Sequence, residues 1–172
     1  MSKRRVCLDA CLFIALQRHQ EHSSEIIGSI KTLLAQIERG DDYAIVSTII
    51  ETELLDGSLE ILEPLCDTRK GEFVDVDRPI AALARKIRNK IVRKAAKEAT
   101  KVLDLPDCVY LATAIIYDCD CFVTIDGLGN NKHSPLSAAD QIKREFKLRV
   151  CSPVDAVDQQ VLDLKVDVEP KK

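Results

Sequence analysis

Residues 107–126, DCVYLATAIIYDCDCFVTID, decide the fold class of this chain. Apolar side chains recur at helical spacing after Asp107 and predict a helix with one apolar face; they are Tyr110, Leu111 and Ala114. Residues 121–125 form a short apolar run that predicts a buried strand, and Asp126-Gly127 ends it with turn-forming residues. A helix that leads into a buried strand ending at an acid is typical of an open α/β sheet. In such sheets functional groups gather at the carboxyl ends of the strands.

The composition is that of one soluble globular domain. The chain has 172 residues, of which 46% are hydrophobic, and its mean hydropathy is −0.06, so it can bury a core of its own. No apolar run approaches ~18 residues, so we expect no membrane span. The basic start at residues 1–5 leads into an apolar segment that Asp9 interrupts, without a small-residue cleavage site, so we expect no signal peptide.

The seven cysteines indicate a reducing environment. Their number is odd, and several stand inside apolar runs, where reduced cysteine behaves as a small hydrophobic residue. We therefore expect a cytoplasmic protein without a disulfide framework. No Cys-x-x-Cys pair occurs, and His19 and His22 lie in a polar stretch, so a zinc site is not expected.

Strands and helices are expected to alternate along the chain. We expect strands at residues 5–8, 43–46, 72–76, 121–125 and 148–151. We expect helices at residues 10–17, from 23 or 24 to a stop at Gly40, 48–55, from 79 onward, from 107 onward, 137–146 and 154–164, with a short helix or turn at 58–65. This alternation predicts an α/β fold with a parallel sheet and helices on both faces.

Two acids directly follow predicted strands. Asp9 ends the strand at residues 5–8, and Asp126 ends the strand at residues 121–125. Each acid has a structural explanation of its own, because Asp9 can cap the next helix and Asp126 can form a turn with Gly127. If both lie at the same end of neighbouring strands, however, their carboxylates repel and are costly to desolvate without a cation. Both are therefore candidate site residues.

Glu51 and Glu53 lie two residues apart in the expected helix at 48–55 and have different interpretations. Glu51 can complete a capping box with Thr48, which is a structural role. Glu53 lies four and three residues after two isoleucines, hence toward the buried side, where an acid needs a partner. Glu53 is the functional candidate and Glu51 the structural one.

Asp104 and Asp107 offer a similar choice at the start of the next helix. Asp104 can be the helix cap, and capping electrostatics alone can explain Asp107 near the positive end of the helix dipole. Asp107, however, shares its face with apolar residues, so it should look toward the sheet. We take Asp107 as the candidate and keep Asp104 in reserve.

If Asp9, Glu53, Asp107 and Asp126 converge, their chemistry follows from their oxygens. A cluster of carboxylates without His or Cys selects Mg²⁺ or Mn²⁺ over Zn²⁺. Such ions lower the pKa of bound water and stabilise a leaving oxygen, so phosphodiester hydrolysis is the reaction that this set favours. It requires no nucleophilic side chain and no catalytic histidine.

Four segments together resemble the PIN-domain ribonucleases, particularly the VapC-type toxins of bacterial toxin–antitoxin pairs. The segments are VCLD at 6–9, VSTIIETELL at 46–55, LPDCVYLATA at 105–114 and FVTID at 122–126. The resemblance extends over most of residues 6–150. It implies a three-layer α/β/α sandwich around a short parallel sheet. We expect a PIN-like nuclease domain at residues 1–152, followed by a C-terminal helix and tail at 153–172.

The resemblance also implies a function and a site. It implies a divalent-metal-dependent endoribonuclease that uses Mg²⁺ or Mn²⁺, acts on RNA, has an antitoxin protein as partner and forms a homodimer. By position, the family's catalytic and metal-binding acids fall on Asp9, Glu53, Asp107 and Asp126, and its supporting hydroxyl falls on Thr124. One departure is Cys11, where the family often has Ser, Thr or Asn.

A basic stretch, residues 85–101, contains many Lys and Arg and one acid, Glu98. The tail from residue 155 onward is acidic, so the charge is uneven along the chain although the net charge is −3. We expect the basic helix to contact RNA phosphates; the residues are Arg85, Arg88, Arg93, Lys94 and Lys97. The alternative is a merely solvated helix.

Two other functions compete with the nuclease interpretation. An aspartyl-nucleophile phosphohydrolase would also begin with an Asp after its first strand, but it needs a second Asp two residues later, where this chain has Cys11. A catalytically degenerate PIN module would bind RNA or a protein without cutting. The four acids argue against the degenerate module, and Cys11 argues for it.

Overall fold

The computed structural model of the chain describes residues 3–54, 59–67, 69–98, 103–128 and 134–157, and of residues 59, 67 and 92–98 it describes the backbone only. The five strands are β1 Arg4–Leu8, β2 Asp42–Ser47, β3 Gly71–Val74, β4 Cys121–Val123 and β5 Arg149–Cys151. The α-helices are α1 Ala10–Gln17, α2 Ser24–Arg39, α3 Leu59–Asp67, α4 Arg78–Glu98, α5 Leu105–Ile116 and α6 Ala139–Phe146. Two 3₁₀-helices are η1 His19–Glu21 and η2 Thr48–Thr52.

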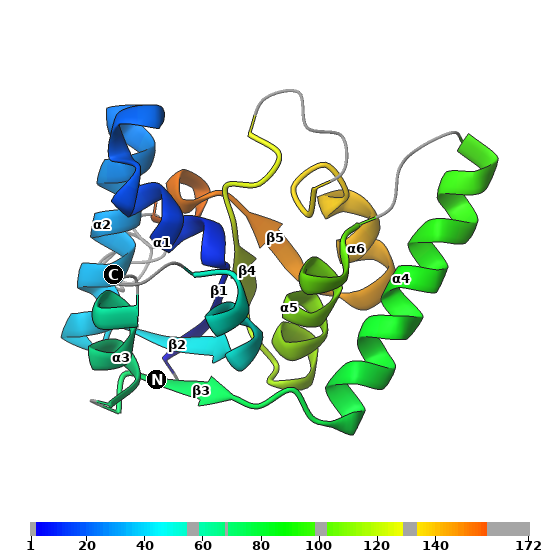
Figure 1. Cartoon of the computed structure of the whole chain (residues 1–172), viewed down its shortest axis with the longest axis horizontal. Coiled ribbons are helices and arrows are strands. Elements are labelled where there is room, and N and C mark those ends of the chain that lie inside the picture. The colour runs from blue at the N-terminus through cyan, green and yellow to red at the C-terminus, as the bar shows by residue number, and fades with distance from the viewer. Residues whose placement is uncertain (1–2, 55–58, 68, 99–102, 129–133, 158–172) are drawn as a thin grey trace, which may run out of the picture.

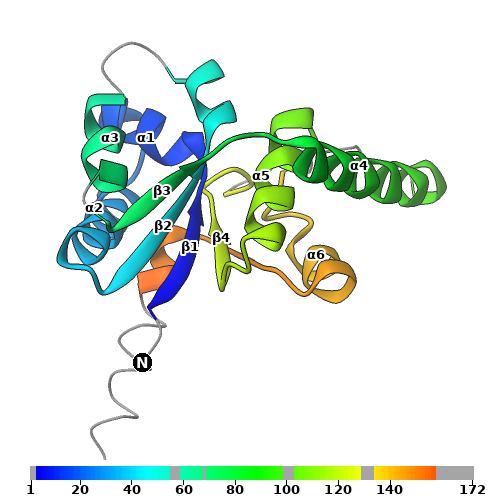
Figure 2. The same ribbon diagram turned by 90° about the horizontal axis from the view of Figure 1, so that it is seen from below.

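The five strands form one parallel sheet in the order β3-β2-β1-β4-β5. Helices α1, α2 and α3 cover one face, and α5 and α6 cover the other, with α4 outside α5 (Figures 1 and 2). This arrangement confirms the predicted α/β fold with three layers. A parallel sheet covered on both faces needs strands that are apolar throughout, and accordingly Val6, Cys7 and Leu8 of the central strand are fully buried.

The register of the central strand brings two predicted site segments together. Leu8 of β1 pairs with Val123 of β4, so both strands end at the same level of the sheet. The chain leaves β1 at Asp9, whose backbone N–H still donates to the Val123 carbonyl at 3.2 Å. Asp9 and the residues after Val123 therefore lie at one edge of the sheet, as expected for carboxyl ends of parallel neighbours.

The opposite end of β1 is fixed by a buried ion pair. The guanidinium of Arg4 donates to both carboxylate oxygens of Asp42, at 3.0 and 2.6 Å, and to the Ala156 carbonyl at 2.8 Å. Asp42 is fully buried, so it requires this two-pronged partner. The pair ties β1 to β2 and to the segment after β5, at the end of the sheet away from Asp9.

Helix α2 begins and ends where the sequence predicts. Ser23 caps it by accepting from the Ile26 N–H at 3.3 Å, and Gly40 ends it in the left-handed conformation, with φ 81°. On the other face, α4 packs along α5, and the Lys90 ammonium forms an ion pair with Glu145 of α6 and lies 5.4 Å from the ring centroid of Phe146. Lys90 thus joins α4 to α6.

The prediction of a helix at residues 48–55 is wrong in type and length. The segment is the 3₁₀-helix η2, and no side chain caps it. Its run of β-branched residues, Thr48, Ile49 and Ile50, has low helix propensity, and Ile50 is drawn fully into the core. The predicted capping box therefore does not form, and Glu51 is exposed.

Several other boundaries differ from the prediction. The strand expected at 121–125 ends at Val123; the next residue, Thr124, still donates its backbone N–H to the Cys151 carbonyl, and its hydroxyl donates to Asp9. The strand expected at 72–76 lies at 71–74, and the helix expected at 137–146 begins at Ala139. Of the helix expected at 154–164, residues 153–157 are helical, and residues 158–172 lie outside the described part of the chain.

All seven cysteines are free, which agrees with the predicted lack of a disulfide framework. Within the described residues, no helix combines the length and apolar character needed to cross a bilayer.

Candidate active site

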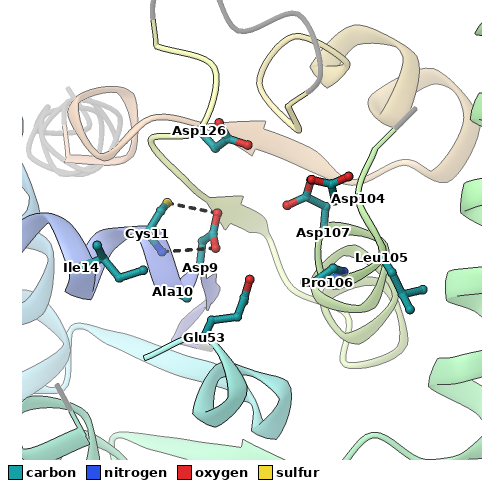
Figure 3. Close-up of a pocket in the computed structure, with 10 residues that line it drawn as sticks. All are labelled: Asp9, Ala10, Cys11, Ile14, Glu53, Asp104, Leu105, Pro106, Asp107 and Asp126. Atoms are coloured by element: carbon teal, nitrogen blue, oxygen red, sulfur yellow. Dashed lines mark hydrogen bonds between the residues drawn. The ribbon is translucent and has the colours of Figure 1, made fainter. Parts of the chain in front are cut away.

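A pocket of about 410 Å³ opens at the carboxyl ends of β1 and β4, beside the start of α5 (Figure 3). It brings the four predicted acids together, with a fifth, Asp104. Figure 3 shows the acids arranged around a common space. The residues that line the pocket are Asp9, Ala10, Cys11, Ile14, Glu53, Asp104, Leu105, Pro106, Asp107 and Asp126.

Asp9 lies at the base of the pocket and is 5% exposed. Its Oδ2 accepts from the Thr124 hydroxyl at 2.5 Å and from the Cys11 thiol at 3.1 Å. Its Oδ1 accepts from the Cys11 backbone N–H at 3.4 Å, which makes Asp9 the N-cap of α1. Burial raises the pKa of Asp9, the bonds from Thr124 and Cys11 act to lower it, and the charge of Asp126 raises it further.

Thr124 connects Asp9 with Asp126. Its hydroxyl donates to Asp9 and accepts from the backbone N–H of Asp126 at 2.9 Å. The chain turns sharply after Asp126, since Gly127 has a φ of 106° and a Cβ there would come within 2.1 Å of the Ser134 hydroxyl. Only glycine fits this position, so the turn that carries Asp126 is set by local geometry.

Cys11 occupies the space between Asp9 and the β4 edge. Its Sγ lies 3.3 Å from the Thr124 hydroxyl and accepts from the Ile125 backbone N–H, also at 3.3 Å. Burial, followed by the charge of Asp9, raises the pKa of the Cys11 thiol well above its usual value. The side chain is therefore a neutral thiol that donates a weak hydrogen bond to Asp9.

Glu53 directly follows η2, and its side chain lines the pocket. Its Oε2 accepts from the hydroxyl of Tyr110 of α5 at 2.5 Å. Burial raises the pKa of Glu53, the hydrogen bond from Tyr110 acts to lower it, and the charge of Asp9 raises it. Glu51, two residues earlier, is exposed and does not line the pocket.

Asp107 and Asp104 face the pocket from the start of α5. Asp104 is the N-cap residue, but its side chain makes no capping hydrogen bond, and it is exposed at the mouth of the pocket. Burial raises the pKa of Asp107 to about 8, and the charges of Asp9, Asp126 and Asp104 add to this effect. The sequence interpretation kept Asp104 in reserve; in the structure it contributes a fifth carboxyl group.

Five of the ten residues that line the pocket are acids, and none of the ten is basic. Asp9, Glu53 and Asp107 all have raised pKa values, first through burial and then through one another or their acidic neighbours. Like charges held together at the end of a sheet are unfavourable unless a positive ligand or protons balance them. The arrangement thus suits a positively charged ligand.

The donor set of the pocket fits a hard divalent cation in chemical type. Its charged groups are carboxylates, and oxygen ligands favour Mg²⁺ or Mn²⁺. As the side chains are placed, however, no three His, Cys, Asp or Glu side chains among the described residues are arranged to hold a metal ion. Binding would therefore require at least some of these carboxyl groups to move closer together.

Tyr110 is the partner that sequence reasoning missed. It was assigned to the apolar face of its helix, and it is indeed only 1% exposed. Its hydroxyl nevertheless bonds a pocket acid that comes from another segment. A hydroxyl at the end of a buried aromatic side chain needs a hydrogen-bond partner. This requirement could have indicated from the sequence that Tyr110 bonds a polar group.

The predicted RNA-contact residues lie on α4. Arg85 and Arg88 are exposed. The charge of Arg88 acts to lower the pKa of Cys108, which burial raises to about 12, so Arg88 faces the first turns of α5. The side chains of Arg93, Lys94 and Lys97 lie outside the described part of the chain.

Comparison with solved structures identifies the fold. One match is a chain in the crystal structure of VapBC2 from Rickettsia felis bound to a DNA fragment from their promoter, with a TM-score of 0.54 and 15% identity over 86% of this chain and 98% of that chain. DNA-bound VapBC from Salmonella typhimurium matches with a TM-score of 0.49 and 16% identity over 87% of this chain and 98% of that chain. VapBC-1 from nontypeable Haemophilus influenzae matches with a TM-score of 0.48 and 13% identity over 87% of this chain and 98% of that chain.

The sequence comparisons found no match. No protein-family model matches the chain, and no curated protein matches it. The fold, however, is the one that the sequence resemblance implied: the chain has a PIN-domain fold of the VapC type.

Proposed function

We propose that the chain is a divalent-metal-dependent endoribonuclease that hydrolyses RNA phosphodiester bonds, and that it is the toxin of a toxin–antitoxin pair. The observation that carries the proposal is the pocket itself, in which Asp9, Glu53, Asp107 and Asp126 come from four separate segments to one space. Their raised pKa values and the absence of a basic lining residue favour a cationic ligand there.

The four acids would hold a Mg²⁺ or Mn²⁺ ion. Such an ion, when bound, activates a water and stabilises the leaving oxygen of a phosphodiester. The protein's own contribution is positioning. Thr124 and Cys11 orient Asp9 by donating to one of its oxygens, and the short turn at Gly127 fixes Asp126.

The basic side of α4 would bind the RNA backbone. Arg85 and Arg88 lie one helical turn apart and are exposed, so both can meet phosphates along one strand. Lys90 is not among the proposed RNA-binding residues, because it pairs with Glu145 and lies against Phe146. The same assignment extends to Arg93, Lys94 and Lys97. RNA held on α4 would have its phosphates beside the start of α5, where Asp104 and Asp107 line the pocket.

The proposed partners follow from the resemblance and the structural similarity. The Rickettsia felis structure is of a VapBC complex, and this supports an antitoxin protein as partner. A homodimer is part of the same proposal. The seven free cysteines support a reducing location, the cytoplasm.

A second candidate is a degenerate PIN module that binds RNA or a protein without cutting it. One observation favours it: the side chains as placed do not form a metal-binding group among the described residues. Cys11 adds to this, because a thiol is a weaker donor to Asp9 than the hydroxyl that the family often has there.

Asp9→Asn tests the proposal. The substitution preserves size and removes one ligand charge; the one oxygen that remains can accept from Thr124 or cap α1, but not both. We expect loss of RNA cleavage with both Mg²⁺ and Mn²⁺, together with an equal or higher melting temperature of the metal-free protein, since repulsion in the pocket falls. Glu51→Gln, which removes an exposed charge nearby, is the control and should cleave as the wild type does. Retained cleavage by Asp9→Asn in both metals would falsify the metal-ligand role of Asp9 and with it the proposed site, and a wild-type protein that binds RNA without cutting would establish the degenerate module.

A further inference from the structure

The hydroxyl of Tyr110 is committed to a pocket acid, although Tyr110 does not line the pocket. Its side chain is 1% exposed and lies in the middle of α5. The hydroxyl donates to Glu53 Oε2 at 2.5 Å, across 57 residues of sequence. This bond links two separate segments at the pocket.

Glu53 depends on such a partner because its own segment holds it weakly. It follows a five-residue 3₁₀-helix, and its backbone N–H donates to the Ile50 carbonyl at 3.0 Å. Its long side chain has several rotatable bonds, so the backbone alone leaves the carboxylate many orientations. The bond from Tyr110 selects one of them.

Tyr110, by contrast, is held rigidly. Its ring stacks on Phe122 of β4, with 6.0 Å between the centroids and 20° between the planes. Asp107 stands three residues before Tyr110 on the same helix, so the two lie on one face of α5. Helix α5 therefore places Asp107 at the pocket, and through the hydroxyl of Tyr110 it also orients Glu53, which belongs to another segment.

We propose that Tyr110 is a positioning residue, which holds the Glu53 carboxylate in the orientation that a divalent cation in the pocket requires. The inference rests on the proposed function. It assigns Tyr110 a role that acts through Glu53, and it predicts that the two residues contribute to cation binding as one unit.

The test is a double-mutant cycle on Mn²⁺ binding by the full chain, followed by the electron paramagnetic resonance of free Mn²⁺. Tyr110→Phe keeps the ring and its stacking and removes only the hydroxyl. We expect it to raise the Mn²⁺ dissociation constant about tenfold, a size typical for the partner of a metal ligand. In a Glu53→Ala background the same change should have no further effect, because no carboxylate remains to be positioned. Tyr117→Phe, at the far end of α5, is the matched control.

Each outcome separates the inference from the proposed function. A tenfold loss in the wild-type background and none in the Glu53→Ala background supports positioning. An equal loss in both backgrounds indicates a general structural effect and overturns it, and so does unchanged binding by Tyr110→Phe. If the wild-type protein binds no Mn²⁺, the proposed metal site itself fails and the inference fails with it. Melting curves of all variants establish that the differences arise in folded protein.

Discussion

Asp107→Asn should change how the stability of the metal-free protein depends on pH. In an unfolded chain an aspartate ionises near pH ~3.9, whereas in the fold the pKa of Asp107 is raised to about 8. Between these values the folded protein binds more protons at this residue than the unfolded protein does. The contribution of Asp107 to the free energy of unfolding therefore falls as the pH rises from about 4 to about 8.

The size of this effect follows from the shift. A change from 3.8 to about 8 is about 4 units, and at about 1.36 kcal/mol for each unit it sets an upper limit of about 5 kcal/mol. Water reaches the carboxyl group through the open pocket, and the side chain can turn toward it, so we expect about 2 kcal/mol. This is a large share of the roughly 5–15 kcal/mol that stabilises a domain.

Urea unfolding of chelator-treated protein at about pH 5 and about pH 8 measures the difference. Asp107→Asn cannot ionise, so it should lose about 2 kcal/mol less than the wild type between the two pH values. Asp75→Asn, an exposed acid outside the pocket, should behave as the wild type does. Equal pH dependence of wild type and Asp107→Asn would refute the raised pKa of Asp107, which burial and the neighbouring acids are taken to cause. Mn²⁺ at pH 8 should restore stability to the wild type, because a ligand that binds only the folded state stabilises it.

Three further predictions concern binding and assembly. Reversing the charges of Arg85 and Arg88 should weaken RNA binding, and it should reduce the slope of log binding constant against log salt by about one unit per lost phosphate contact. The control Lys31→Glu, on the opposite layer, should do neither. An unchanged slope in a filter-binding titration would contradict the role of α4 in RNA binding. Cys11→Ser should lower the Mn²⁺ dissociation constant several-fold, since a hydroxyl is a stronger donor to Asp9 than a thiol. Equal Mn²⁺ affinities of wild type and variant in calorimetry would show that the thiol does not weaken cation binding. The protein should elute as a homodimer, so light scattering that gives a mass near one chain of 19.2 kDa would contradict that proposal.

The sequence predicted the fold because the local patterns and the packing agree. The strands alternate with helices, and caps such as Ser23 and stops such as Gly40 stand where the structure uses them. The segment at residues 48–55 failed because a pattern of polar residues predicted a capping box, while the β-branched run and the burial of Ile50 required a 3₁₀-helix. Propensity and tertiary packing disagreed there, and packing decided the outcome.

The pocket was predictable in part. Acids at strand ends can be read from the sequence, because the carboxyl ends of parallel neighbours share one edge of the sheet. The placement of Glu53 was expected for a reason that the structure does not support, since no α-helix turns it inward. Glu53 instead follows the 3₁₀-helix η2, and its carboxylate accepts from Tyr110 of another helix. Contacts of this kind depend on three-dimensional packing between distant segments, and periodicity within one segment cannot reveal them.

Asp9 shows that the structural and functional interpretations of a residue need not exclude each other. Its bond to the Cys11 N–H is long, at 3.4 Å, and so is weak as a cap, whereas the Thr124 hydroxyl donates to its other oxygen at 2.5 Å. Since an ionised carboxylate accepts at both oxygens, Asp9 can do both. An asparagine has one oxygen, so it must either cap α1 or accept from Thr124. The shorter bond should decide, and the amide nitrogen would then face the Cys11 N–H, where it cannot accept. Asp9→Asn should therefore lose the cap at a cost of about 1 kcal/mol, which partly offsets the gain from reduced repulsion, and a metal-free melting temperature close to that of the wild type is the expected net result.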